Sequence, residues 1–110
     1  MVVCASALPQ LHPLYMDHLC KPLHSHLVRM AYEGCTHHEE HAMEHLFALL
    51  PHDDQADLAA YYGLFGHQRC SLDDIAARHA EAPDKALARL NRSLRRLAVT
   101  PEWQMMASGQ

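Results

Sequence analysis

The segment between Pro83 and Pro101 constrains the fold most, because it predicts one amphipathic helix with a continuous apolar side. The apolar positions are Leu87, Leu90, Leu94 and Leu97. They recur three, four and three residues apart, which is the spacing of one helix face. A stripe this short cannot support a coiled coil by itself, so we expect it to pack in a core. Pro83 fits the first helical turn, and Thr100-Pro101 is expected to end the helix.

Helical patterns also cover most of the rest of the chain. Hydrophobic residues make up 49% of the 110 residues and there are only four glycines, a composition that suits a modest core built from helices. The spacing of the apolar residues predicts further helices at about 11–34, 36–50, 53–62 and 71–80. The predicted fold class is therefore all-α, a small bundle of about five helices with a C-terminal helix-turn-helix.

Polar residues mark the expected starts of these helices. Thr36 with Glu39, and Ser71 with Asp74, have the spacing of a capping box, in which each side chain bonds the backbone amide of the other residue. The helix that ends near residue 62 is expected to be capped by Asp53 or Asp54.

The chain is expected to consist of three parts. Residues 1–35 are predicted to form an N-terminal tail and helical extension, which Pro22 kinks or splits because it removes a backbone donor. Residues 36–100 are predicted to form the main domain. Residues 101–110 are expected to be a loose C-terminal tail from which Trp103 packs back.

The charged residues are unevenly distributed. The formal net charge is −4, yet five of the nine lysines and arginines fall in the last predicted helix. These five are Lys85, Arg89, Arg92, Arg95 and Arg96. Arg89, Arg92 and Arg96 lie off the leucine stripe and are expected on its solvent side. The pattern predicts a local anion-binding face on an otherwise acidic molecule.

The sequence favours a cytoplasmic protein with no membrane association. Its first ten residues lack the basic and apolar regions of a secretory signal, and no apolar run approaches the roughly 18 residues that a membrane span needs. The four cysteines are far apart and form no CxxC pair, which is typical of reduced thiols.

Several short motifs between residues 50 and 97 occur in a suggestive order. They are Leu50-Pro51, Tyr62-Gly63-Leu64, the helix start from Ser71 to Ala76, and the helix end from Ser93 to Leu97. Together they resemble region four of bacterial sigma factors, the module that carries promoter recognition on RNA polymerase. The resemblance implies a helix-turn-helix whose second helix enters the major groove. A second helix with basic residues opposite its apolar stripe suits that role.

The resemblance also implies roles for individual residues. Ser71 and Leu72 would approach the phosphate backbone, and the exposed side of the last helix would face bases. The helix carrying Leu58, Tyr61 and Tyr62 would face the polymerase flap.

The family's base-reading positions can be placed on the last helix in two ways. In the family these positions carry Arg, Glu, Arg and Gln. An ungapped alignment puts Pro83, Asp84, Leu87 and Ala88 there. A one-residue insertion in the turn puts Asp84, Lys85, Ala88 and Arg89 there. Neither alignment keeps the full set, and the turn at 79–82 lacks the apolar residue that usually plugs it.

These observations favour a small transcription regulator that acts at promoter DNA, at RNA polymerase or at both. The predicted nucleic-acid residues are Ser71, Leu72, Asp84, Lys85, Ala88, Arg89, Arg92, Arg95 and Arg96. The alternative is an interaction module that binds RNA polymerase or sigma without reading DNA, in the manner of an anti-sigma factor or a phage Q-type antiterminator. No nucleophile–base pair, phosphate-binding loop or pair of carboxylates indicates an enzyme.

A third hypothesis is a metal-binding helical protein. His37, His41 and His45 recur every four residues, so they share one helix face and could hold zinc. A solvated face with His–Glu pairs explains the same pattern, and the two HxxEH matches that it contains follow from the four-residue period. No other cofactor is expected.

Overall fold

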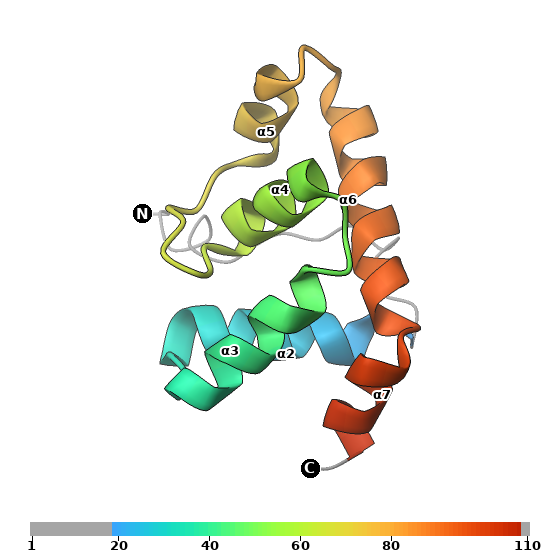
Figure 1. Cartoon of the computed structure of the whole chain (residues 1–110). Helices are drawn as coiled ribbons and strands as arrows, with labels where there is room; N and C mark the ends of the chain where they lie inside the picture. The colour runs from blue at the N-terminus through green and yellow to red at the C-terminus, as the bar shows by residue number, and fades with distance from the viewer. Residues whose placement is uncertain (1–18, 109–110) are drawn as a thin grey trace.

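The computed structural model describes residues 19–108, which form helices joined by short turns (Figure 1). The helices are α2 Lys21–Glu33, α3 His37–Phe47, α4 His52–Tyr62, α5 Leu72–Arg78, α6 Pro83–Ala98 and α7 Pro101–Ser108. There are six helices and no strand among the described residues, which confirms the all-α fold class with one helix more than expected.

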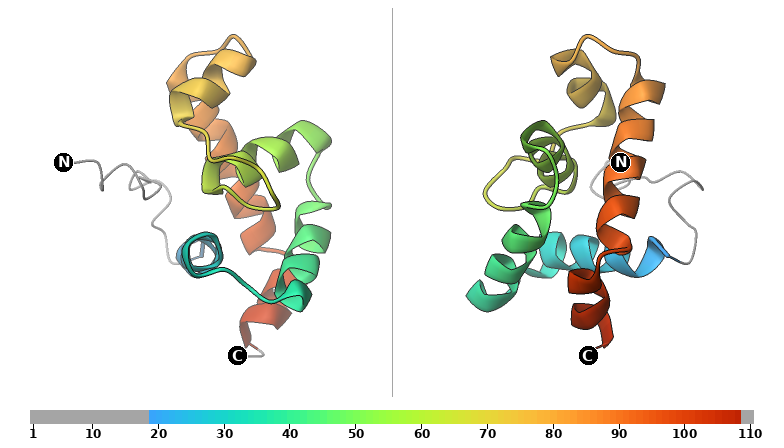
Figure 2. Two further views of the ribbon diagram at one scale, coloured as in Figure 1. Left: turned by 90° about the vertical axis from the view of Figure 1, so that its left-hand side faces the viewer. Right: turned by 45° about the vertical axis from the view of Figure 1, so that its right-hand side comes forward.

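Helix α6 is the element on which the others assemble. It contacts α5, α4, α2 and α7 along its length. Two further views show α5 at the N-terminal end of α6, with α2 and α7 near its C-terminal end (Figure 2). All four leucines of the α6 stripe are buried, as their spacing predicts. They share one core with Leu23 and Leu27 of α2 and with Phe47 of α3.

Helix α2 begins where the sequence places a proline. Pro22 lies in its first turn, where the missing backbone donor would have no partner inside the helix. The expected kink or split at Pro22 is therefore a helix start. The earlier part of the predicted first helix, at 11–18, lies outside the described residues.

The caps of α3 and α5 follow the sequence signals. Thr36 Oγ1 accepts from the Glu39 amide and Glu39 Oε1 accepts from the Thr36 amide, both at 3.0 Å, which completes the predicted capping box. Ser71 Oγ accepts from the Asp74 amide at 3.1 Å, as expected. The predicted aspartate cap of α4 is wrong. That helix starts directly after Pro51 without a side-chain cap, and Asp53 and Asp54 lie in its first turn, where they complement the helix dipole.

The C-terminal residues are not the loose tail that the sequence suggested. Pro101–Ser108 forms α7, and Thr100 Oγ1 accepts from the Trp103 amide at 3.1 Å. A threonine followed by proline ends one helix and also matches the start of another, because proline is favoured at the first helical position. Trp103 packs back into the core, as predicted, with 5% of its surface exposed.

Helix α2 is joined to α4 by a histidine–tyrosine contact. Nδ1 of His24 lies 2.8 Å from the Tyr62 hydroxyl, and the two rings are tilted against each other. The His24 side chain is half-buried, and this burial lowers its pKa. Burial also lowers the pKa of His26, with a further contribution from Arg29.

Mild acidification is expected to destabilise the fold through these two histidines. Below the unfolded-state pKa of about 6.5, the unfolded chain binds protons that the folded chain excludes. The free energy of unfolding therefore decreases as the pH is lowered. Urea unfolding at about pH 7.5 and pH 5.5 measures this loss. His24→Gln, which keeps a polar group beside Tyr62 without titrating, should reduce the loss. His37→Gln, at an exposed position, should not. If His24→Gln lost as much stability between about pH 7.5 and pH 5.5 as the unaltered chain, His24 would not be a source of the pH dependence.

Candidate nucleic-acid interface

The turn between α5 and α6 has the hydrogen bonds of a tight helix end. The Ala80 amide donates to the Ala77 carbonyl and the Glu81 amide donates to the Ala76 carbonyl, both at 3.1 Å. This pair of bonds is the Schellman arrangement, which normally has glycine at the left-handed position. Here that position is Ala80, with φ of 52°. The turn is thus sharply defined although its sequence contains no glycine.

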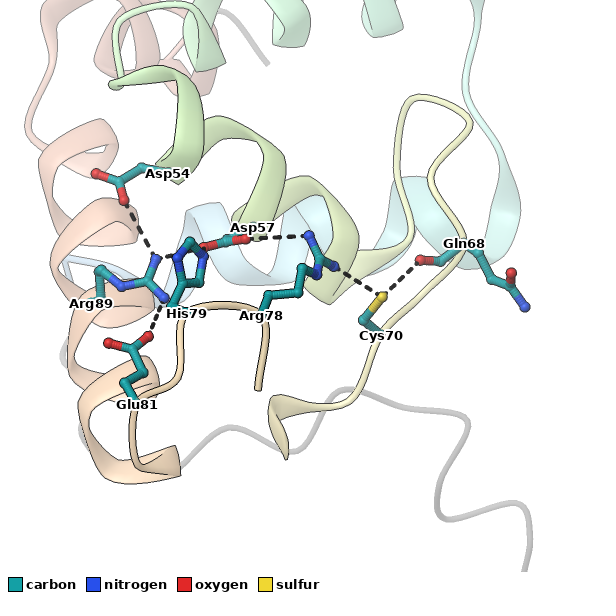
Figure 3. A network of polar contacts seen from close by, with 8 residues as sticks. All are labelled: Asp54, Asp57, Gln68, Cys70, Arg78, His79, Glu81 and Arg89. Atoms are coloured by element: carbon teal, nitrogen blue, oxygen red, sulfur yellow. Dashed lines mark hydrogen bonds and ion pairs between the residues drawn. The ribbon is translucent and has the colours of Figure 1, made fainter. Parts of the chain in front are cut away.

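A buried carboxylate ties this turn to α4. Asp57, with 2% of its surface exposed, accepts a hydrogen bond from Arg89 Nη1 on α6 at 2.6 Å (Figure 3). His79 Nε2, just after α5, lies 2.8 Å from the same carboxylate, and Arg78 Nη1 lies 3.5 Å from its other oxygen. One side chain of α4 therefore meets groups from α5, from the turn and from α6.

Arg89 is the second centre of this network. Its other guanidinium nitrogen bonds to Glu81 in the turn, and Nη1 also lies 3.6 Å from Asp54. Burial lowers the pKa of Arg89, but its hydrogen bonds to Glu81 and Asp57 outweigh that effect and raise the pKa above its usual value. We define the Asp57 cluster as Asp54, Asp57, Arg78, His79, Glu81 and Arg89.

The Asp57 cluster corrects one sequence prediction. Arg89 was expected on the solvent side of the last helix, but only 17% of its side chain is exposed, and its charge is paired within the fold. Neither Asp57 nor His79 stands out in the sequence. The one available signal was a carboxylate directly before Leu58, inside a segment that otherwise supplies core residues. That signal does not identify a partner.

The remaining basic residues of α6 form an exposed stripe. The basic stripe consists of Lys85, Arg92, Arg95 and Arg96, all exposed. Lys85, Arg92 and Arg96 are seven and four residues apart, so they follow one face of the helix. That face is opposite the buried leucines, and exposed Ala88 lies within it. The structure thus brings together four of the five basic residues that the sequence selected.

The first two turns of α6 offer few groups that could read bases. Leu87 is only 8% exposed, so the ungapped alignment places a core residue at a base-reading position. The alignment with an insertion places Arg89 there, and this residue belongs to the Asp57 cluster. Asp84, Lys85 and Ala88 are exposed, and among these three only Lys85 has a side-chain donor.

The start of α5 is acidic where the resemblance implies a phosphate contact. Ser71 is exposed and its hydroxyl caps the helix, while Leu72 packs against the core. Asp73 and Asp74 occupy the first turn and are exposed. Their carboxylates repel a phosphate group, so the basic stripe is the stronger candidate for contact with an anionic backbone.

The residues assigned to a polymerase contact lie in the core. Leu58, Tyr61 and Tyr62 are 1%, 7% and 1% exposed. The Tyr62 hydroxyl is bonded to His24 of α2, so α2 covers part of this face of α4. These three side chains are therefore part of the core and not of an exposed face of α4.

The three candidate metal ligands do not form one site. His37, His41 and His45 are exposed on α3, and His41 Nε2 lies 3.2 Å from His45 Nε2. Across residues 19–108, no group of three or more histidine, cysteine, aspartate or glutamate side chains is placed to hold a metal ion. The predicted three-histidine site is therefore not formed.

Comparisons of the chain with protein-family models, with curated proteins and with solved structures find no match. None of the helices described between residues 19 and 108 has the length and hydrophobicity that a membrane crossing requires. The charge and geometry of α5 and α6 are therefore the strongest guide to function.

Removal of the Asp57 carboxylate is expected to destabilise the protein strongly. Asp57→Ala leaves Arg89, which is largely buried, without one of its two close ion pairs, and this should lower the free energy of unfolding by about 3 kcal/mol. Asp73→Ala removes an exposed carboxylate from α5 and should cost less than about 1 kcal/mol. Chemical denaturation of both variants measures the difference. Equal losses would show that the Asp57 cluster does not hold the helices together.

Replacement of the left-handed alanine is expected to stabilise the turn. Ala80→Gly removes the steric cost of a side chain at positive φ, which is about 1 kcal/mol, and adds some flexibility to the unfolded chain. The expected net gain is about 0.5 kcal/mol in the free energy of unfolding. Ala77→Gly, inside α5, is the matched control and should destabilise by about 1 kcal/mol. A loss of stability in Ala80→Gly would show that the left-handed conformation of Ala80 does not strain the turn.

Proposed function

We propose that this chain is a small, non-enzymatic transcription regulator of the cytoplasm that binds duplex DNA through the basic stripe of α6. The observation that supports the proposal is the position of the stripe: four exposed positive side chains lie on α6, three of them on the face opposite its buried leucines. This helix is also the second helix of a helix-turn-helix, the element that enters the major groove in such domains.

The dimensions of the stripe suit a phosphate backbone. Lys85 and Arg96 are eleven residues apart, which corresponds to about 16 Å along a helix. Duplex DNA carries one negative charge per about 1.7 Å of its axis, so several phosphates lie within reach of such a stripe. The whole chain has a net charge of −4, so the DNA backbone repels the acidic residues outside α6. This repulsion favours an approach in which α6 faces the DNA.

The exposed residues favour affinity over sequence discrimination. Arginine and lysine contacts with phosphates position a protein on DNA, while side-chain bonds to base edges give specificity. Lys85 is the single donor among Asp84, Lys85 and Ala88 in the first two turns of α6. We therefore propose that the chain binds promoter DNA largely through contacts with the phosphate backbone of the DNA.

The second candidate is a module that binds RNA polymerase or sigma without reading DNA. The sparse base-reading set of α6 favours it, because a surface that docks on protein needs no such set. In this role the basic stripe would meet an acidic protein surface. The buried Leu58, Tyr61 and Tyr62 would take no direct part.

Salt dependence of binding to a duplex DNA tests the first candidate. Each phosphate contact contributes a slope of about −0.9 to the log–log plot of affinity against salt, so Arg92→Ala should make the slope about 0.9 less steep and weaken binding. Arg92→Ala/Arg96→Ala should change it by about 1.8. Fluorescence anisotropy with a labelled duplex measures both quantities.

Lys21→Ala is the matched control, since it removes one exposed positive charge from α2 and leaves α6 intact. It should leave the slope unchanged. Equal effects of Lys21→Ala and Arg92→Ala would exclude a localised interface. Absence of DNA binding at low salt, with retention of the chain by core polymerase or by sigma, would overturn the first candidate in favour of the second.

A further inference from the structure

The outer face of α3 carries a close pair of imidazoles. His41 and His45 are one turn apart, and their Nε2 atoms are 3.2 Å from each other. The two rings meet edge to face, with centroids 4.6 Å apart. Both residues are exposed, and α3 lies at the opposite end of the molecule from the α5–α6 turn (Figure 1). The pair is therefore accessible and separate from that turn.

The separation of the two nitrogens is that of ligands on one metal ion. Two imidazole nitrogens at about 2.0–2.1 Å from a tetrahedral zinc ion lie about 3.3 Å apart. His41 and His45 already hold their Nε2 atoms at nearly this distance. The contact is a hydrogen bond, so one of the two Nε2 atoms carries the proton between them. A metal ion can replace this proton when it moves to Nδ1 of the same ring, and the four-residue spacing keeps both rings on one helix face.

A carboxylate lies beside the other nitrogen of one of these rings. Glu44 Oε1 is 3.7 Å from Nδ1 of His41, slightly longer than a hydrogen bond. In metal sites a carboxylate that is hydrogen-bonded to Nδ1 orients the ring so that Nε2 faces the metal. Glu44 is close to that position.

We propose that His41 and His45 chelate one divalent transition-metal ion of the class that imidazole prefers, such as Zn²⁺, Ni²⁺ or Cu²⁺. Two protein ligands leave the other coordination positions to water, so the site is an open one. Glu44 is a positioning residue that acts through His41. The inference does not depend on the proposed DNA binding, because the basic stripe of α6 contributes none of these groups.

Zinc titration followed by the ¹⁵N signals of the imidazole rings tests the site residue by residue. With the full chain, the Nε2 signals of His41 and His45 should shift together and reach a plateau near one equivalent of bound Zn²⁺. In His41→Ala, the affinity of His45 for Zn²⁺ should fall about tenfold or more, because the second ligand no longer binds within the same molecule. Glu44→Gln should weaken binding by a smaller factor.

His37→Ala is the matched control, since His37 lies one turn earlier on the same helix face and is also exposed. It should leave the shifts of His41 and His45 unchanged. A loss in His37→Ala equal to that in His41→Ala would overturn the two-ligand site. Independent shifts of all histidines at similar Zn²⁺ concentrations would also overturn it, as would full affinity of His45 in His41→Ala.

Discussion

The carboxylate of Asp57 is the interaction on which the helix-turn-helix depends. It is buried, with 2% of its surface exposed, where an unpaired charge would be very costly. Arg89, Arg78 and His79 surround it and come from both sides of the α5–α6 turn. The turn at 79–82 has no large apolar side chain, and its His79 and Glu81 instead bond to Asp57 of α4 and Arg89 of α6. A polar anchor sets the position of α6 more narrowly than apolar contact does, because hydrogen bonds to a carboxylate are directional.

Because of this cluster, one arginine of α6 stabilises the fold while others remain available for binding. Arg89 neutralises Asp57 and Glu81 and belongs to the fold. Arg92 and Arg96 follow on the same side of α6, three and seven residues after Arg89, but they remain exposed to solvent. A charge that is already paired in a largely buried place gains little from a phosphate, whereas an exposed guanidinium exchanges counterions for one. The proposed interface is therefore smaller than the count of basic residues suggested, and it can change without loss of the fold.

Helix α2 determines which side chains of α4 are exposed. Helix α2 packs against α4, and the contact between His24 and Tyr62 lies at this junction. The aromatic side chains of α4 are consequently part of the core, and α6 carries the exposed face with the clearest charge pattern. The same α2 helix brings two half-buried histidines into the fold, which couples its stability to pH near neutrality.

The sequence by itself determined the features that depend on neighbouring residues. The all-α class, the buried leucine stripe of α6 and the capping box at Thr36 all follow from spacings of a few residues. Only the tertiary structure decided which polar groups meet. Arg89 and Asp57 are 32 residues apart, and His24 and Tyr62 are 38 apart, so no periodicity connects them. Helix α7 was also decided only by the structure, because Thr100-Pro101 is compatible both with the end of one helix and with the start of another. Local patterns specify helices and their faces, whereas the pairing of buried charges depends on how those faces pack in three dimensions.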